Sequence, residues 1–401
     1  MIKAQTLKGF RDFLPADAIK RQFLIGKIQT VFERFGFDPL ETPALEYAET
    51  LLGKYGDEAD KLLYTFEDRG GRKVGMRYDQ TVPAARVVAQ YGQDIPSPFK
   101  RYQLQPVWRA ENTQKGRYRE FLQCDIDTFG EASYLADAEI IACVYAVMRE
   151  LGFASFRISI NDRTLFGDTP PGAITVIDKL AKIGPEGVKK ELTSKGFDPM
   201  LLETIRSNKP SVLLRKIMEL LPDLGVSLNS VRFDPTLARG LDYYTSTIVE
   251  VSIDGYTAGS VGGGGRYDNL IGQFMGKQVP AVGFAFGFDR MLEAMDEANL
   301  LPTKKTATSV FVAVFSPALF AQSLILVSRL RDAGVAAEVS LDASAKLDKQ
   351  LKYADRKGIP YAVIQGPKEK TKNRVLLKSM ATQKQDEITV DELIARLTKD
   401  E

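Results

Sequence analysis

The sequence has no histidine among its 401 residues. This absence excludes every catalytic scheme that needs an imidazole as nucleophile, base or metal ligand, including serine–histidine–aspartate hydrolysis and histidine-ligated zinc. Only two cysteines are present, Cys124 and Cys143, which are too few for a disulfide framework and suit a reducing compartment. Phosphate chemistry that is run by arginines and magnesium survives these exclusions.

Long apolar runs and a large net charge are also missing. No apolar stretch approaches the length that crosses a membrane, and Ile140–Met148 is among the longest. The first residues carry charges where a signal peptide would need its apolar core. We therefore expect a cytoplasmic protein with no membrane segment. The net charge of +2 does not indicate a nucleic-acid binder, so contacts with RNA would have to come from local patches.

The chain is long enough for two or three domains, and its hydrophobic content of 44% is ample for their cores. Residues 169–228 are dominated by helical patterns broken by glycine and proline, and they interrupt strand-rich sequence on either side. Residues 301–308 are polar and contain a proline, as linkers do. Beyond them strands and helices alternate, which predicts an α/β domain with a mostly parallel core.

The most informative segment is a pair of predicted strands, Phe99–Trp108 and Tyr118–Phe129, joined by a long polar turn. Arg109 closes the first strand, and Arg117 and Arg119 open the second. Guanidinium groups on a rigid hairpin suit a phosphate or carboxylate ligand, because they match its oxygens bidentately and keep their charge. The alternative from these residues alone is a solvated basic hairpin.

A second group of features lies near residue 260. Four consecutive glycines, Gly262–Gly265, would let the backbone approach a ligand closely, although a plain flexible turn also explains them. Ala281–Phe286 has the composition of a buried strand, and Asp289–Asn299 is predicted to be a helix with Arg290 in its first turn. The backbone dipoles there would add positive potential near that arginine.

Taken together, these segments resemble the class II aminoacyl-tRNA synthetases, in the form found in histidyl-tRNA synthetases. The hairpin resembles motif 2, ARGLDYYTSTIVEV (238–251) resembles the signature of the histidyl enzymes, and GGGGRYDNL with VGFAFGFDRML (262–270 and 282–292) resembles motif 3. KGFRDFLP (8–15) and KQLKYADRKGIPYAVI (349–364) also match. Residues 37–46 resemble motif 1, whose proline lies at the dimer interface in the family, although an edge strand explains them equally well.

The resemblance implies an α/β fold. It consists of an α+β catalytic domain with an antiparallel sheet, class II synthetase-like, and a C-terminal α/β anticodon-binding-like domain with a mixed sheet. The expected divisions are a catalytic domain in two parts, 1–165 and 231–300, an inserted helical subdomain at 166–230, a linker at 301–308 and the anticodon-binding domain at 309–401. We assign no functional residue to the insertion.

The resemblance also implies a reaction. ATP would activate L-histidine to histidyl-adenylate, and the aminoacyl group would pass to the 3′ end of tRNA(His), in an enzyme that is a homodimer. Arg109 and Arg239 would be the catalytic arginines, on opposite sides of the α-phosphate. The implied ATP-binding residues are Arg109, Glu111, Arg117, Phe121 and Arg290. Magnesium is expected through the ATP phosphates, with no metal site on the protein.

Recognition of histidine needs acceptors for its ammonium group and partners for both ring nitrogens. The residues implied by the resemblance are Asp79, Gln80, Thr81, Arg109, Gln123, Asp127, Arg239, Tyr243 and Tyr244. Gln123 and Asp127 are four residues apart, so they face the same side of a strand. The alternatives are surface or capping carboxylates and ordinary strand packing of the tyrosines. Gln80 departs from the family pattern, in which we expect leucine or glycine.

The main alternative function is that of a non-catalytic relative, the regulatory subunit of ATP phosphoribosyltransferase, which is built on the same catalytic fold. The presence of Arg239 and of a C-terminal α/β domain argues against it. A generic RNA-binding α/β protein would leave the arginines unexplained. Because imidazoles are missing, we expect any inflection of adenylation between about pH 5 and 8 to belong to substrate histidine or the N-terminal amine.

Overall fold

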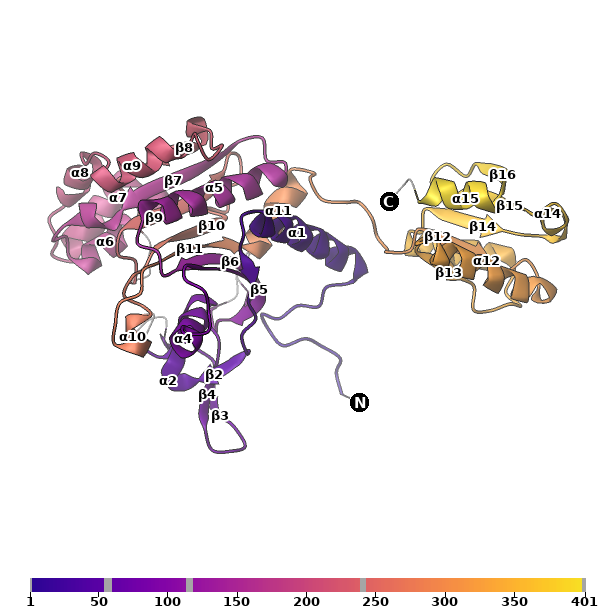
Figure 1. Cartoon of the computed structure of the whole chain (residues 1–401), viewed down its shortest axis with the longest axis horizontal. Helices are drawn as coiled ribbons and strands as arrows, with labels where there is room; N and C mark the ends of the chain where they lie inside the picture. Colours follow the sequence, from indigo (N-terminus) through magenta and orange to yellow (C-terminus); the bar gives the residue numbers. More distant parts are fainter. Residues whose placement is uncertain (1, 54–59, 113–117, 239–242, 399–401) are drawn as a thin grey trace. The chain divides into compact units, whose positions relative to one another are not determined.

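A computed structural model describes residues 2–53, 60–112, 118–238 and 243–398 (Figure 1). The chain divides into two compact units, which are described separately. The larger unit contains residues 24–301 and the N-terminal residues up to 12, and the smaller unit contains the chain from residue 302 onward together with residues 13–23. Across these described ranges, no helix has the length and apolar character needed to span a membrane.

The larger unit is built on a wide sheet. Within the described ranges the strands follow the order β1-β5-β6-β11-β10-β9-β7-β8. The outer pairs β1–β5 and β7–β8 are parallel, and all pairs between them are antiparallel. The bounds are β1 Asp38–Pro39, β5 Phe99–Trp108, β6 Glu120–Phe129, β7 Phe156–Asp162, β8 Val231–Phe233, β9 Thr247–Ile253, β10 Gly262–Arg266 and β11 Ala281–Gly287. This confirms the expectation of a largely antiparallel sheet in this part of the chain.

Three helices cover the apolar face of this sheet: α1 (Pro15–Arg34), α5 (Tyr134–Glu150) and α11 (Phe288–Glu297) (Figure 1). The second half of α1 buries residues at helical spacing, and its Phe32 stacks on Phe286 of β11 with the ring centroids 6.3 Å apart. Helix α5 starts where the hydroxyl of Ser133 accepts a hydrogen bond from the backbone N–H of Leu135. The helices therefore fix the sheet from one side and leave its other face for a site.

The opposite face of the sheet is polar and is only partly covered. Helix α4 lies on it together with a small sheet of strand order β2-β4-β3 (Figure 1). Tyr78 and Val82, around the start of α4, belong to the same buried cluster as Phe129 of β6 and Tyr267, which follows β10. The bounds are α2 Ala48–Leu51, α4 Thr81–Tyr91, α10 Gly272–Met275, β2 Leu45–Tyr47, β3 Thr65–Glu67 and β4 Lys73–Met76.

Helices occupy most of the segment between β7 and β8. They bury an apolar cluster of their own, which includes Val188, Leu192 and Leu202. Helix α7 is kinked at Gly184, where φ is +69° and Pro185 follows. The bounds are η1 Arg163–Phe166, α6 Pro171–Ile177, α7 Leu180–Ser194, α8 Leu201–Arg206, α9 Val212–Leu220 and η2 Leu228–Ser230. The separate cluster supports our proposal of a helical subdomain at 166–230.

The four glycines Gly262–Gly265 form strand β10 in the middle of the sheet, so the flexible-turn alternative is wrong. Glycine is required here by close packing rather than by a turn. A Cβ at Gly264 would lie 2.6 Å from the Cα of Phe284 and would overlap the carbonyl of Gly283. At Gly265 φ is +155°, and a Cβ there would overlap the carbonyl oxygen of Thr247. The neighbouring strands can therefore approach only a strand without side chains.

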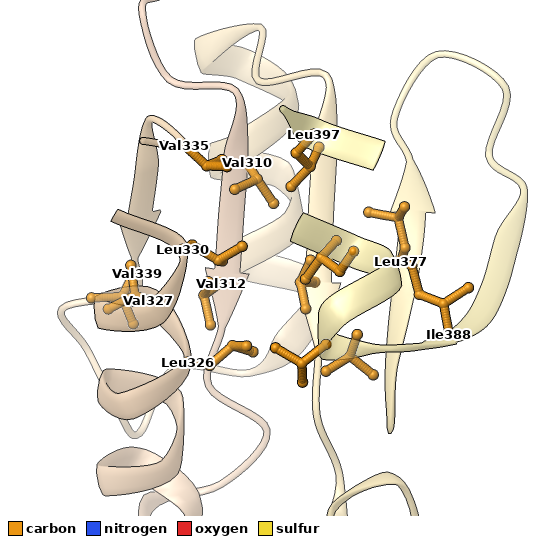
Figure 2. Close-up of a cluster of buried hydrophobic side chains, with 14 of the residues drawn as sticks. Val310, Val312, Leu326, Val327, Leu330, Val335, Val339, Leu377, Ile388 and Leu397 are labelled. Carbon is orange, nitrogen blue, oxygen red and sulfur yellow. The ribbon is translucent and has the colours of Figure 1, made fainter. Parts of the chain in front are cut away.

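The smaller unit is an α/β domain. Its sheet has the order β13-β12-β14-β15-β16, in which β13, β12 and β14 are parallel and β15 and β16 are antiparallel. Figure 2 shows its main core, in which Val310 and Val312 of β12 pack with Leu326 and Leu330 of α12. The bounds are β12 Val310–Ala313, η3 Pro317–Leu319, α12 Phe320–Asp332, β13 Ala337–Val339, α13 Leu347–Lys357, β14 Tyr361–Ile364, α14 Pro367–Thr371, β15 Arg374–Ser379, β16 Gln385–Thr389 and α15 Val390–Leu397. The mixed sheet agrees with the expected domain type.

Replacing Gly264 with alanine tests the packing of β10. The added Cβ has no space between β10 and β11, so we expect Gly264→Ala to destabilise the larger unit by about 1–3 kcal/mol or more. Gly26→Ala is the matched control, because Gly26 lies on the exposed side of α1 with nothing within 4 Å of its Cβ position. That variant should gain about 0.5–1 kcal/mol from helix propensity. Thermal melts of both variants measure the effect, and equal melting temperatures for the two would contradict the packing argument.

Candidate active site

A cavity of about 490 Å³ lies on the polar face of the main sheet, in the larger unit. Gln123, Asp125 and Asp127 alternate along β6 and line it together. The cross-strand partners of the two acids on β11 are Ala285 and Gly283. The polar side chains of β6 thus lie beside glycine and alanine on the same face of β11 and β10, and this difference in side-chain size creates the hollow.

Arg109 lies at the wall of the cavity, directly after β5. Its Nε donates a hydrogen bond of 3.1 Å to the carbonyl of Tyr78. Its guanidinium carbon is 4.2 Å from the ring centroid of Tyr78 and 5.1 Å from that of Phe121. The two rings and the carbonyl hold the positive charge in one place before any ligand arrives.

Arg290 reaches the same cavity from the first turn of α11. Its Nη1 donates a hydrogen bond of 2.9 Å to the carbonyl of Ser260, which precedes β10. Phe121 and Glu111 also line the cavity. The structure therefore brings together four of the five residues expected to bind ATP. The fifth, Arg117, lies outside the described residues, as does Arg239.

An N-terminal contact at this cavity was missed by the sequence analysis. The guanidinium of Arg11 lies 3.2 Å from the ring centroid of Tyr118 and forms an ion pair of 2.9 Å with Asp289. The carbonyl of Gly9 accepts a hydrogen bond of 2.9 Å from the backbone N–H of Arg119. The resemblance of KGFRDFLP (8–15) to the family pointed to this region, but it did not assign a role to any of its residues. Arg11 joins the start of β6 to α11 beside Arg290.

Asp127 lies in a buried network at the other end of the floor. One of its oxygens pairs with the fully buried Arg101 at 2.5 Å, and the other accepts a hydrogen bond from the hydroxyl of Tyr267. Burial raises the pKa of Asp127 to about 6, although Arg101 and the Tyr267 hydroxyl act in the opposite direction. Our expectation that only substrate and the N-terminal amine titrate between about pH 5 and 8 is therefore incomplete. Sequence reasoning identified neither Arg101 nor Tyr267.

The residues around the start of α4 divide into two groups. Asp79 and Thr81 line the cavity, and Asp79 also accepts a hydrogen bond of 3.1 Å from the backbone N–H of Val82. Gln80 does not line it. Its side chain is fully buried and donates to the carbonyls of Gln105 and Gln123, at 2.7 and 3.3 Å. Gln80 thus ties α4 to β5 and β6, which differs from the direct histidine contact that we expected.

The remaining expected residues lie together. Tyr243 and Tyr244 line the cavity with their ring centroids 4.8 Å apart, and Gln123 lies on the floor. Asp125 was missed, although its position between Gln123 and Asp127 in the alternating pattern of β6 could have identified it. Both of its carboxyl oxygens are buried and have no hydrogen-bond partner in the part of the chain that the structure describes.

An antiparallel sheet with arginines around a glycine-lined cavity, followed by an α/β unit with a mixed sheet, defines the class II aminoacyl-tRNA synthetase type. A family model described as histidyl-tRNA synthetase matches residues 9–169 and 199–291. A second model, described as anticodon binding domain, matches residues 309–400. The chain therefore belongs to the histidyl-tRNA synthetase family.

Individual relatives agree with this assignment. Histidine–tRNA ligase of Rhodopirellula baltica is 40% identical, over 97% of this chain and 96% of its own length. That of Gloeobacter violaceus is 40% identical, over 97% of this chain and 98% of its own. The crystal structure of histidyl-tRNA synthetase from Nostoc sp. PCC 7120 covers 100% of both chains with a TM-score of 0.87 and 30% sequence identity.

The buried network around Asp127 predicts a pH-dependent stability. Between about pH 4 and 6 the unfolded chain has lost the proton that the folded state keeps on Asp127, so this contribution to stability falls as the pH rises through 6. Tyr267→Phe removes the hydroxyl that favours the ionised form. We therefore expect the melting temperature of this variant to fall more at pH 8 than at pH 5, relative to the unmodified protein.

Tyr256→Phe is the matched control, because it removes a tyrosine–carboxylate hydrogen bond of 2.9 Å to the part-buried Glu293, away from Asp127. Its loss in melting temperature should be the same at both pH values. An equal loss for Tyr267→Phe at pH 5 and pH 8 would show that Tyr267 does not stabilise an ionised Asp127.

Proposed function

We propose that the chain is a histidine–tRNA ligase, which activates L-histidine with ATP and transfers the aminoacyl group to the 3′ end of tRNA(His). The observation that carries this proposal is the placement of Arg109, Phe121 and Arg290 around one cavity whose floor is acidic. Cations at one end suit the phosphates of ATP, and carboxylates at the other suit the ammonium and ring N–H groups of histidine.

In the first half-reaction the carboxylate of histidine attacks the α-phosphorus of ATP, and pyrophosphate leaves. Negative charge develops on the α-phosphate oxygens and on the departing pyrophosphate, so preorganised cations are the main contribution of the protein. Arg109 fits this role, because its guanidinium is already fixed by Tyr78 and Phe121. We assign Arg239 to the opposite side of the phosphate on the basis of the family resemblance.

The adenine would lie between Phe121 and Arg290, since an aromatic ring and a guanidinium plane both stack on a base. Glu111 would help to place the nucleotide, and Arg117 would reach its distal phosphates. Arg11 would act on this half of the site without touching ATP, because it fixes Tyr118 and Asp289 at its edge.

Magnesium would enter with ATP. Within the described ranges, no group of three or more aspartates, glutamates or cysteines is arranged to hold a metal ion. Phosphate oxygens and water are ligands that Mg²⁺ prefers, so the nucleotide itself supplies a suitable donor set. The ion would neutralise phosphate charge beside Arg109 and Arg290.

For histidine, Asp79 and Thr81 would bind the ammonium group at the start of α4. Gln123, Asp127, Tyr243 and Tyr244 would surround the rest of the amino acid, with Arg109 and Arg239 near its carboxylate. Gln80 would support this half of the site from behind, through its hydrogen bonds to β5 and β6.

We further propose that the smaller unit binds the tRNA, that the enzyme is a homodimer and that it works in the cytoplasm. The match of residues 309–400 to an anticodon-binding domain supports the first of these roles. Basic side chains on α13 could contact RNA, but Lys352 pairs with Asp348 at 2.8 Å and Lys357 pairs with Glu338. These two lysines are satisfied within the domain.

The function is tested by ATP–pyrophosphate exchange with each amino acid in turn, in the presence of magnesium and without tRNA. Exchange with histidine alone is the expected result, because the acidic floor can pair with both ring nitrogens of this substrate. A folded protein that binds histidine but exchanges with no amino acid would instead match the regulatory relative of the family.

Arg109→Ala should lower the rate of histidine-dependent exchange by about 10²–10³, the usual loss when one preorganised charge donor is removed from a transition state. Arg239→Ala should have an effect of the same size. The control is Arg149→Ala on the exposed side of α5, which should exchange at the normal rate. A normal rate for Arg109→Ala would remove this residue from the proposed mechanism.

A further inference from the structure

We propose that Asp125 is a specificity-determining residue, whose carboxyl group forms a hydrogen bond with the imidazole ring of the substrate histidine. This inference rests on the proposed function and deepens it, because it identifies a polar partner for the ring that the family resemblance did not name.

The first observation is the burial of Asp125. The residue is 1% exposed, it lies in the middle of β6 and it lines the cavity. Neither carboxyl oxygen has a hydrogen-bond partner within residues 2–53, 60–112, 118–238 and 243–398. Buried polar groups are paired in most folded proteins, because an unpaired carboxyl loses its hydration without compensation. An orphaned carboxyl in a cavity wall is therefore expected to be completed by a ligand.

The second observation is that the neighbouring acids are already committed. One oxygen of Asp127 pairs with Arg101, and the other accepts the hydroxyl of Tyr267. Asp79 accepts the backbone N–H of Val82 at 3.1 Å. Of Asp79, Asp125 and Asp127, Asp125 is the one with no hydrogen-bond partner for either carboxyl oxygen among the described residues.

The third observation is the shape of the floor. The cross-strand neighbour of Asp125 on β11 is Ala285, and the next residue across, on β10, is Gly263. These residues leave a low surface beside the carboxyl group, on which a flat ring can lie with its edge toward Asp125. A large side chain at either position would fill this space.

In the proposed hydrogen bond, either the carboxyl group of Asp125 or the imidazole ring of histidine can hold the proton. Burial raises the pKa of Asp125 well above its ordinary value; Arg101 and Arg109 lower it, and Asp127 and Asp79 raise it further. A neutral carboxyl can donate O–H to a bare ring nitrogen, and a carboxylate can accept a ring N–H. Both arrangements contain one proton and one hydrogen bond, and an apolar ring of the same shape can form neither.

The test compares histidine with β-(2-thienyl)alanine, which has a similar flat ring but no ring N–H. The affinity for histidine is taken from ATP–pyrophosphate exchange, and that for thienylalanine from competitive inhibition of this exchange. In Asp125→Ala the preference for histidine over thienylalanine should fall by about 10- to 100-fold, the range for one hydrogen bond with a charged group. Asp125→Asn keeps one acceptor and one donor, so its preference for histidine should lie between those of the unmodified protein and Asp125→Ala.

Thr128→Val is the matched control. Thr128 is also buried on β6 with an unpartnered side-chain oxygen, but it projects to the opposite face of the sheet. This variant should keep the full preference for histidine. In melts without ligand, Asp125→Ala should be at least as stable as the unmodified protein, because it removes an unpaired buried carboxyl, while the rise in melting temperature on adding histidine should shrink.

The outcomes separate this inference from the function on which it rests. If the unmodified protein shows no exchange with histidine, the proposed function fails. If exchange is normal but Asp125→Ala weakens histidine and thienylalanine equally, Asp125 does not contact the ring, and the inference is overturned. An equal loss of this kind is also the result expected if Asp125 bound the ammonium group, which both amino acids share.

Discussion

The close approach of β10 and β11 is the constraint on which the rest of the larger unit depends. A Cβ at Gly264 would overlap the carbonyl of Gly283 on the adjacent strand, and a Cβ at Gly265 or Gly283 would overlap atoms of β9 or β6 on the other side. The same absence of side chains leaves a hollow beside the polar row of β6, so one sequence feature both closes the sheet and opens the cavity. The polar face of the sheet buries little apolar surface. The helices on its other face supply that burial.

A sheet with buried acids on its functional face must balance their charge. Arg101, the cross-strand neighbour of Asp127 on β5, is fully buried and pairs with it. The hydroxyl of Tyr267 donates a hydrogen bond to the same carboxylate. Removing either partner would leave a charge uncompensated away from water. Asp125 has no hydrogen-bond partner among the described residues. The fold therefore completes Asp127, whereas the substrate completes Asp125.

The elements that the sequence predicted well are those that local pattern determines. The four-residue spacing of Gln123 and Asp127 survives in the fold, because alternate residues of β6 face the same side of the sheet and both side chains line the cavity. The glycine strand β10 could not be recognised in this way, since glycine has low strand propensity and only the packing of Phe284 and Thr247 makes it necessary. Tertiary contact, rather than local preference, determines that strand.

The site shows the same division. A family pattern identifies residues that line the cavity, such as Arg109 and Arg290, because their chemistry is visible in the residue type. It does not identify Arg101 or Tyr267, whose role depends on a partner far away in the sequence, and it assigned Gln80 to the ligand although its amide is used by β5 and β6. Asp125 differs from all of these, since its role follows from hydrogen bonds that it does not make. Only a structure that accounts for every buried polar atom can show such a residue.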